Sequence, residues 1–162
     1  MVKKTEKTNV MRILDQKKIK YKSYCYEGSG AVSGLEVAEV LEQNPKSVFK
    51  TLVTVGKSKK NYVFVIPVDA ELDLKKAACA VGEKSIAMIK SKELLPLTGY
   101  VHGGCSPIGM KKFFETVIDE TAEDFENIIF SAGKIGYQVE VGLKELAEII
   151  DFSIADTKIL SS

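Results

Sequence analysis

Residues 51–68 read TLVTVGKSKKNYVFVIPV and hold two β-rich segments on either side of a lysine-rich turn. The segments 51–55 and 62–68 consist mostly of Val, Ile, Thr and aromatic residues, which pack well on a pleated sheet. Because only a short polar turn separates them, the two segments are predicted to pair as a hairpin. This hairpin is the clearest structural signal in the chain, and the expectations for the other segments are built around it.

Helix and strand signals continue on both sides of the hairpin. Ser33 and Glu36 have the spacing of a capping box, which predicts the start of a helix. The buried face of this helix is expected to hold Leu35, Val37, Ala38 and Leu41. Asn44-Pro45 has the pattern of an N-cap followed by a first-turn proline, typical of a short helical turn. Further helices are expected at 8–18, 73–80, 91–96 and 143–150, and further strands at 21–26, 85–89, 100–102, 113–118, 128–131, 137–141 and 152–155.

These elements favour one domain over residues 1–162, since the four prolines are scattered and no repeat or low-complexity tract interrupts the chain. Strands outnumber helices, and several connections are too short for parallel crossovers. We therefore expect an α/β (α+β) fold. The prediction is a single compact domain with a mixed, mostly antiparallel, barrel-like sheet and helices packed outside it.

The composition excludes several classes of protein. Basic and acidic residues number 23 and 22, which argues against a strongly cationic nucleic-acid coat, and 45% apolar content argues against global disorder. No apolar run approaches the ~20 residues of a membrane span, and the N-terminus lacks the apolar region of a signal peptide. We expect a cytoplasmic protein that does not enter a membrane.

The cysteines and the single histidine exclude further kinds of site. Three cysteines lie far apart, so neither a disulfide framework nor a zinc knuckle is expected, and one histidine excludes a multi-histidine metal site. No metal or other cofactor is therefore expected. His102 and Cys105 would point to opposite faces of a strand, which disfavours a Cys–His dyad. Cys25 and Cys79 are expected to behave as small hydrophobic residues.

The charges are distributed unevenly along the chain. Residues 1–22 hold eight bases and two acids, whereas residues 115–156 hold eleven acids and two bases. Two solvated helix faces would explain this pattern. The alternative is a basic patch that meets an anionic partner at one end of the molecule.

Three segments hold residue types that can carry chemistry. Lys50 lies where a helical turn passes into a strand, so its side chain either snorkels to the surface or lies at the mouth of a pocket. The loop 103–109, GGCSPIG, can turn backbone N–H groups toward an anion or an oxyanion, or can simply connect two strands. Residues 131–136, SAGKIG, have the composition of a hairpin turn.

Taken together and in this order, VFKTLV, GGCSPIGMKK and SAGKIGYQVEV resemble the YbaK/EbsC family of aminoacyl-tRNA deacylases. That family is similar to the editing domain inserted in bacterial prolyl-tRNA synthetases. The resemblance covers nearly the whole chain and also includes Tyr26-Glu27, Asn44-Pro45 and the segment VDAELDLKK. It implies one α/β domain with a barrel-like mixed sheet that acts in trans on mischarged tRNA. The best-known branch removes cysteine from proline tRNA, because a proline site cannot strongly reject a near-isostere.

The resemblance also implies roles for individual residues. Lys50 matches the essential lysine of the family, which holds the aminoacylated 3′ end by charge-assisted hydrogen bonding. The loop beside the pocket, whose N–H groups would fix the acyl carbonyl, is matched by Gly103, Gly104, Ser106, Pro107 and Gly109. The pocket lining is matched by Tyr26, Ser131, Gly133 and Gln138. In the cysteine-specific branch of the family, the resemblance implies that the thiol of the substrate attacks its own carbonyl, so the enzyme supplies positioning and electrostatics. Lys50, Gly103 and Gly104 are the residues implied in catalysis.

Two departures from the family pattern leave open which amino acid the protein would remove from the tRNA. Gln138 stands where some relatives carry aspartate, and Ser33 where some carry phenylalanine. A Cys-tRNA(Pro) deacylase is the first interpretation, and a deacylase for alanine or another small residue is the second. The third is a non-catalytic module that binds a tRNA end or docks on prolyl-tRNA synthetase. Retention of Lys50 with both glycine-rich loops argues against the third, because binding alone would not require that pocket.

Overall fold

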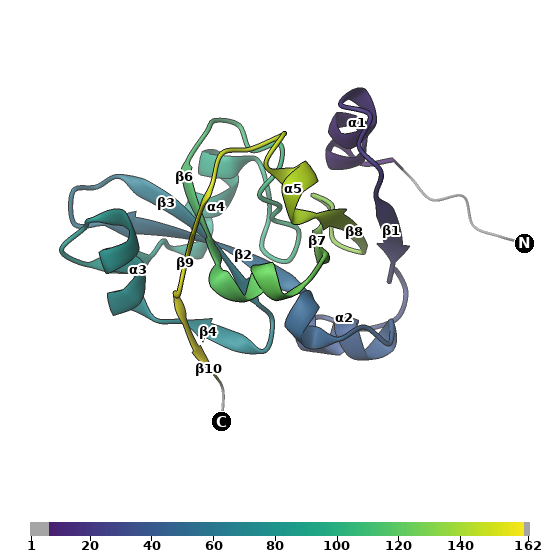
Figure 1. The fold of residues 1–162 in the computed structure, drawn as a ribbon, viewed down its shortest axis with the longest axis horizontal. Coiled ribbons are helices and arrows are strands. Elements are labelled where there is room, and N and C mark those ends of the chain that lie inside the picture. The colour runs from purple at the N-terminus through teal and green to yellow at the C-terminus, as the bar shows by residue number, and fades with distance from the viewer. Residues whose placement is uncertain (1–6, 161–162) are drawn as a thin grey trace, which may run out of the picture.

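The hairpin predicted at 51–68 lies in the middle of the largest sheet (Figure 1). Strands β2 (Phe49–Gly56) and β3 (Asn61–Pro67) pair antiparallel, with Lys50 opposite Ile66. Nearly all of β3 is buried, as expected for a strand with neighbours on both edges and side chains packed on both faces. The hairpin prediction is therefore confirmed.

The computed structural model describes residues 7–160, and these form three sheets. The five-stranded sheet has the order β5-β2-β3-β6-β9, in which β6 pairs parallel with both β3 and β9. The second sheet, β1-β8-β7, is antiparallel, and β10 pairs antiparallel with β4. The remaining strands are β1 (Lys22–Cys25), β4 (Ala70–Leu72), β5 (Ile86–Met88), β6 (Glu115–Asp119), β7 (Asn127–Ser131), β8 (Tyr137–Gly142), β9 (Ser153–Ala155) and β10 (Lys158–Leu160). The expected mixed α+β architecture is confirmed, with open sheets rather than a closed barrel over the described residues.

Two helices begin where their caps predict, after Ser33 and after Asp73. Ser33 and Glu36 form the complete capping box, and the carboxylate of Asp73 accepts from the first-turn N–H groups of its helix. Gly82 ends that helix in the left-handed conformation, with φ at 73°. The helices are α1 (Asn9–Gln16), α2 (Gly34–Val40), α3 (Leu74–Val81), α4 (Ser91–Thr98) and α5 (Leu143–Leu146), with short 3₁₀ turns η1 (Pro45–Ser47) and η2 (Glu120–Asp124).

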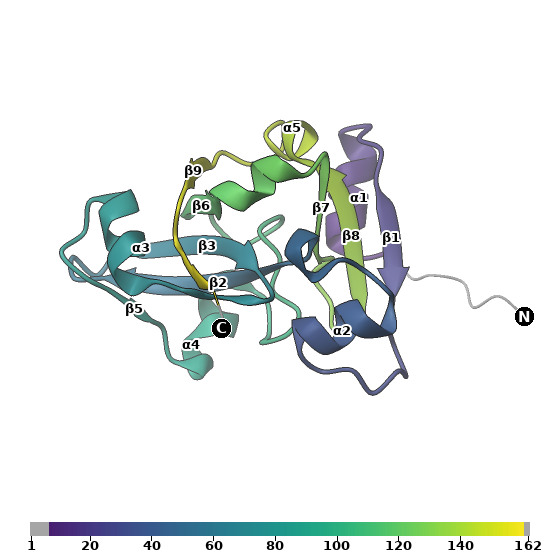
Figure 2. The ribbon, with the colours of Figure 1, turned by 60° about the horizontal axis from the view of Figure 1, so that its bottom comes forward.

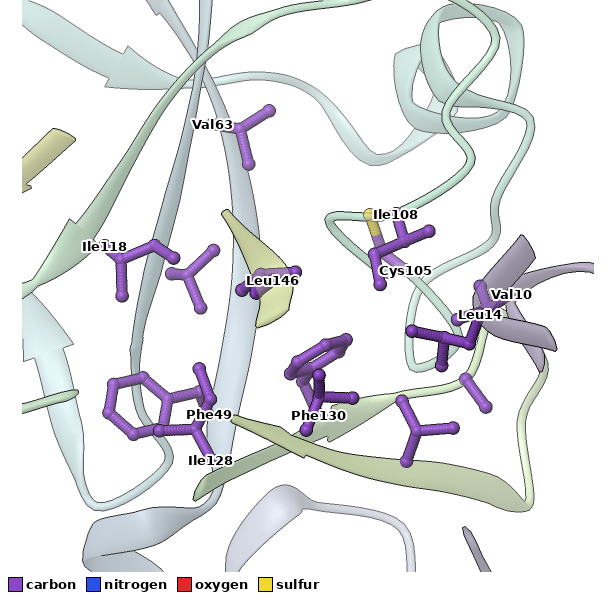
Figure 3. Packing of buried hydrophobic residues seen from close by; sticks show 14 of the residues in the cluster. Val10, Leu14, Phe49, Val63, Cys105, Ile108, Ile118, Ile128, Phe130 and Leu146 are labelled. Carbon is purple, nitrogen blue, oxygen red and sulfur yellow. The ribbon is translucent and has the colours of Figure 1, made fainter. Parts of the chain in front are cut away.

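The main hydrophobic core fills the space between the five-stranded and the three-stranded sheets (Figure 3). Phe49 of β2 and Phe130 of β7 meet there, and α1 contributes Val10 and Leu14, both fully buried. Figure 2 shows α1 and α2 at the three-stranded sheet. They pack on its opposite faces, since α1 belongs to the main core and Ala38 of α2 to a separate cluster. Burial of this core is the main favourable term in folding.

Some predicted elements differ from the structure. Helix α4 continues through Pro96 to Thr98, because proline at that position removes only one backbone hydrogen bond, and Gly99 ends the helix with φ at 86°. Ser91 is the first helical residue of α4, and Lys90 is its N-cap, whereas the sequence pattern predicts Ser91 as the cap. Residues 100–102 form no strand, and α5 ends well before residue 150.

The burial prediction for α2 is partly wrong. Val37 and Ala38 are buried, but Leu35 is 49% exposed, because only a narrow face of the helix packs against the sheet. Strands β4 and β10 and the turn η2 were not predicted. The two strands are three residues long and depend on pairing with each other, so neither has a pattern of its own.

Asp119, at the end of β6, holds the C-terminal segment against the sheet. Its carboxylate is fully buried and accepts from the backbone N–H of Thr157 at 2.9 Å and from the hydroxyl of Thr121 at 2.7 Å. The ammonium of Lys158 lies 3.4 Å away. Burial alone would raise the pKa of Asp119, but these hydrogen bonds and Lys158 outweigh burial and hold the pKa below its usual value.

Substitution Asp119→Ala is expected to lower the free energy of unfolding by about 3 kcal/mol at pH 7, since it leaves buried donors without their acceptor and removes one of the two carboxylates beside Lys158. The difference in the free energy of unfolding between wild type and variant should have its full size above the unfolded pKa of aspartate, about 3.9. It should disappear as the pH falls through the lower pKa that Asp119 has in the folded state. Urea unfolding between pH 2 and 7 measures this. Asp156→Ala removes a carboxylate that is 44% exposed and should cost less than about 1 kcal/mol; equal effects of the two substitutions would contradict the role of Asp119.

Candidate active site

Lys50 enters the site from the first residues of β2. The turn η1, capped by the side chain of Asn44, leads directly into the strand. Side chains alternate along a strand, so Val48 and Lys50 point to one face and Phe49 to the other, into the main core. The sequence-predicted lysine therefore lies on the face away from the main core.

The ammonium of Lys50 is half-buried and carries no ion pair to any described residue. Burial lowers its pKa, and the more distant carboxylates of Glu71 and Asp69 only partly oppose this effect. A partly desolvated ammonium without a bonded counter-ion is well suited to binding an anionic or strongly polar group of a ligand.

Strand pairing brings Ser131 and Gln138 to the same face as Lys50. A parallel bridge joins Val48 to Ile129, and Lys50 and Ser131 each follow their bridge residue by two positions. Across β7 and β8, Ser131 lies opposite Gln138. The structure thus brings together three predicted site residues from neighbouring strands.

The same face continues onto β1, where Tyr24 lies opposite Gln138. The Tyr24 hydroxyl donates to Glu140 at 2.6 Å, and this bond raises the pKa of Tyr24 to about 12. Tyr26 follows two residues later and donates its backbone N–H to the carbonyl of Gly136. We call Tyr24, Gln138, Ser131 and Lys50 the cross-strand row.

Helix α2 covers the apolar side of this row. Ala38 packs with Val48, Val68 and Ile129, and Tyr24 lies against the same cluster. Gln43, just past the end of α2, donates from Nε2 to Oε1 of Gln138 at 2.9 Å. Sequence reasoning missed Gln43, because a polar residue after a helix gives no signal for a partner 95 positions away.

The two glycine-rich loops pack against each other and against α1. A Cβ added at Gly104 would lie 3.1 Å from the backbone nitrogen of Ile135, and one at Gly133 would lie 3.0 Å from Val10. Gly109 has φ at 79° and no room for a side chain beside the hydroxyl of Tyr100. Gly104 leaves room for the other loop, whereas Gly133 and Gly109 leave room for Tyr100 and α1 and have positive φ angles that disfavour a side chain.

Several groups of loop 103–109 are buried or form hydrogen bonds that hold the loop in its conformation. Gly104 donates its N–H to the carbonyl of Val101 at 2.9 Å, so this group is not available to a ligand in this conformation. Ser106 is fully buried, with its hydroxyl accepting from the N–H of Ile108. Pro107 is buried as well. The backbone N–H groups of Gly103, Ser106 and Gly109 make no hydrogen bond to the described residues; Gly109 lies against α1.

Cys105 is a core residue and not a nucleophile exposed to substrate. It packs beside Ile108 (Figure 3), and burial raises the pKa of its thiol to about 12, so the thiol is protonated at neutral pH. His102 is exposed. The expectation for the other two thiols is wrong, since both Cys25 and Cys79 are exposed.

The described residues offer no group of three or more His, Cys, Asp or Glu side chains arranged to hold a metal ion. Over the same part of the chain, no helix is long and apolar enough to cross a membrane. A surface hollow of about 350 Å³ lies elsewhere, between α3 and β10, and shares no residue with the cross-strand row.

Comparison with known proteins identifies the family of this chain. The sequence model of the aminoacyl-tRNA editing domain matches residues 30–149, which include Lys50, both glycine-rich loops and Gln138. An Enterococcus faecalis protein provisionally named Cys-tRNA(Pro)/Cys-tRNA(Cys) deacylase EbsC is 46% identical over 156 residues, covering 95% of each chain. The proline–tRNA ligase of Lactobacillus gasseri is 26% identical over 105 residues, which are 65% of this chain and 18% of the ligase.

One crystal structure, described as a provisional trans-editing enzyme for prolyl-tRNA synthetase, has the same fold. It superposes with a TM-score of 0.79 at 23% identity, covering 94% of this chain and 98% of the other. The family match over residues 30–149 and the relative that is 46% identical establish the relationship. The chain belongs to the aminoacyl-tRNA editing domain family.

Proposed function

We propose that this protein hydrolyses the ester of mischarged tRNA in trans, and that Cys-tRNA(Pro) is its substrate. The observation that carries the proposal is the unpaired, half-buried ammonium of Lys50 on the same strand face as Ser131 and Gln138. The relative with 46% identity has the same activity in its name. The proposal places the protein in the cytoplasm with charged tRNA as its partner.

The chemistry follows from what the site holds and what the substrate brings. The substrate thiol attacks its own carbonyl carbon, a C–S bond forms as the ester C–O bond breaks, and the ribose oxygen takes the thiol proton. Water then opens the resulting thiolactone to cysteine. The protein holds the 3′ end through Lys50 and donates hydrogen bonds to the carbonyl oxygen as its negative charge grows.

A deacylase for alanine or another small residue is the second candidate, because a neutral amide at Gln138 does not select among small uncharged side chains. Alanine has no thiol, so water would have to attack the ester directly. Hydrolysis of a panel of mischarged tRNAs, including Cys-tRNA(Pro) and Ala-tRNA(Pro), separates the two. If the protein hydrolyses none of these tRNAs but still binds tRNA or the synthetase, a non-catalytic module would be favoured. A pull-down with prolyl-tRNA synthetase tests that partner.

Substitution Lys50→Ala is expected to reduce kcat/KM for Cys-tRNA(Pro) by about one to two decades, the equivalent of one charge-assisted contact of roughly 1.5–3 kcal/mol. Single-turnover deacylation measures the loss. Lys46→Ala is the matched control, because Lys46 lies four residues earlier, is exposed and pairs with Asp69. Wild-type turnover by a folded Lys50→Ala protein would contradict the assignment.

Substitution Cys105→Ser should retain most activity, because a thiol with a pKa of about 12 inside the core is not the group that reacts. Deacylation is measured together with circular dichroism, since a buried hydroxyl lowers stability by about 1–3 kcal/mol. A covalent acyl adduct on Cys105, found by mass spectrometry, would reverse this interpretation.

The basic N-terminal region is expected to contribute modestly to tRNA affinity. Helix α1 lies against both glycine-rich loops, and the lysines nearest to it, Lys7, Lys17 and Lys18, lie just beyond its two ends. Lys7 is paired with Asp15, and Lys3 and Lys4 fall outside the described residues. Changing Lys3, Lys4, Lys7 and Lys18 to Gln should weaken tRNA binding and reduce its salt dependence, because fewer counterions are released. Identical affinity and salt slope in the two proteins would show that these lysines are only solvated surface.

A further inference from the structure

The edge of the five-stranded sheet beyond Lys50 carries a run of lysines without ion pairs. Residues 57–60 and 83–93 lie along this edge and hold six lysines and two acids. The edge strand is β5, which pairs with β2. Four of these lysines are exposed and form no ion pair with a described residue. We call these four the lysine track: Lys57, Lys59, Lys84 and Lys90.

Strand pairing places the start of the lysine track on the same face as Lys50. Met88 lies opposite Thr54, and residues directly opposite each other in a sheet share a face. Lys50 and Thr54 are separated by an even number of positions on β2, so their side chains also share a face. Lys90 follows Met88 by two residues, and the N–H of Ile89 still bonds to β2 at 3.4 Å. The exposed side chains of Met88 and Lys90 therefore lead away from Lys50 along the sheet edge.

The far end of the lysine track lies about 20 Å from Lys50, since β2 continues to Gly56 at about 3.4 Å per residue. The turn follows there, and the N–H of Lys57 bonds to the carbonyl of Ser85 at 3.1 Å. This bond brings Lys57 next to Lys84, although the two are distant in the chain. Figure 2 shows β2 running from beside α2 to the end of the molecule that carries α3 and β5. Positive charge thus extends from the site to that end.

The carboxylates near the lysine track are already bonded. Glu83 accepts from the hydroxyl of Tyr62 at 2.7 Å, and Glu93 accepts from the backbone N–H at the N-cap of its own helix at 3.0 Å. Glu115 pairs with Lys60. Among the described residues, none of these carboxylates forms an ion pair with a lysine of the track. An anion that approaches this edge therefore meets ammonium groups that do not have to leave a protein partner.

The opposite end of the sheet is acidic. Strand β6 runs parallel to β3, so its last residue, Asp119, and the turn η2 lie away from residues 57–60. Residues 120–126 hold four acids and no base. Like charge would repel RNA phosphates there. A nucleic acid bound at Lys50 is therefore directed along the edge at β5 and not across the sheet toward η2.

We propose that the lysine track binds the phosphate backbone of the tRNA acceptor stem while the aminoacylated 3′ end lies at Lys50. This inference rests on the proposed deacylase function, which places the ester there. Between the ester and the paired stem, tRNA has a short single-stranded 3′ end, which can follow the edge past Lys90 and Met88 to Lys57. Lysine suits this role, because a contact to the phosphate backbone requires positive charge and no bidentate base recognition.

The double variant Lys57→Gln/Lys84→Gln removes two charges from the far end of the lysine track. The probe is an RNA hairpin with the acceptor stem and 3′ end of tRNA(Pro), and fluorescence anisotropy measures its binding at several salt concentrations. We expect about tenfold weaker binding at low salt. The slope of log K against log salt should be smaller by about 1 to 2, because two phosphate contacts no longer release counterions.

Lys144→Glu is the matched control. It lowers the net charge by the same two units, at an exposed position of α5 in the acidic part of the chain. The control should bind the hairpin like the wild type, with the same salt slope. Equal effects in the control and the double variant would overturn the inference, because net charge alone would then explain the binding.

Single-turnover deacylation of Cys-tRNA(Pro) separates binding from chemistry. Lys57 and Lys84 lie more than two Debye lengths of about 8 Å from Lys50, so they should not act on the reacting ester. The protein concentration for half-maximal rate should rise about tenfold, and the rate at saturating protein should stay the same. A lower rate at saturation with an unchanged half-saturation would overturn the inference. So would unchanged RNA binding together with aggregation in gel filtration, which would assign these lysines to protecting the edge strand.

The two proposals can fail separately. If the wild type hydrolyses no mischarged tRNA while hairpin binding depends on Lys57 and Lys84 as expected, the proposed function fails and the RNA-binding surface stands. If the wild type hydrolyses Cys-tRNA(Pro) and the double variant binds the hairpin like the wild type, the lysine track fails and the proposed function stands.

Discussion

The alternation of side chains along β2 is the constraint on which the site depends. Phe49 and Val53 enter the main core, while Val48 and Lys50 lie on the other face, where β7 joins β2 through the bridge at Ile129. A shift of one residue in this register would place a charged lysine in the core and a phenylalanine at the site. The burial of Phe49 therefore also positions Lys50, and the stability of the core keeps the lysine on the same strand face as Ser131.

The elements with local signals were predictable from the sequence, and the site was predictable only in part. The hairpin, the cap at Ser33 and the helix between Asp73 and Gly82 depend on residues close in the chain, so their patterns are visible in it. Lys50 and the glycine-rich loops were singled out from the residues themselves, whereas their catalytic roles came from a family resemblance and stay predictions. Gln43 was missed because its partner lies on a distant strand. The short strands β4 and β10 were missed because each is defined only by the other.

The loops show how composition and packing lead to different conclusions. From the sequence, loop 103–109 either turns its backbone N–H groups toward an anion or oxyanion or simply connects two strands. In the structure, Gly104 is small because the backbone at Ile135 is close, and its N–H is bonded to Val101. This loop packs closely against the turn of β7 and β8, and Ser131 accepts a hydrogen bond from Gly133 of that turn. Close packing around a site supports catalysis that depends on positioning rather than on a protein nucleophile.

The half-buried ammonium of Lys50 has a consequence for how this protein divides its free energy between folding and binding. The ammonium loses part of its water shell when the chain folds, and no bonded carboxylate among the described residues replaces that water. The dehydration is therefore a cost to the stability of the folded state, and an arriving substrate does not have to bear it again. Stability and substrate capture are opposed at this one position, so selection for a more stable chain alone would tend to remove the lysine.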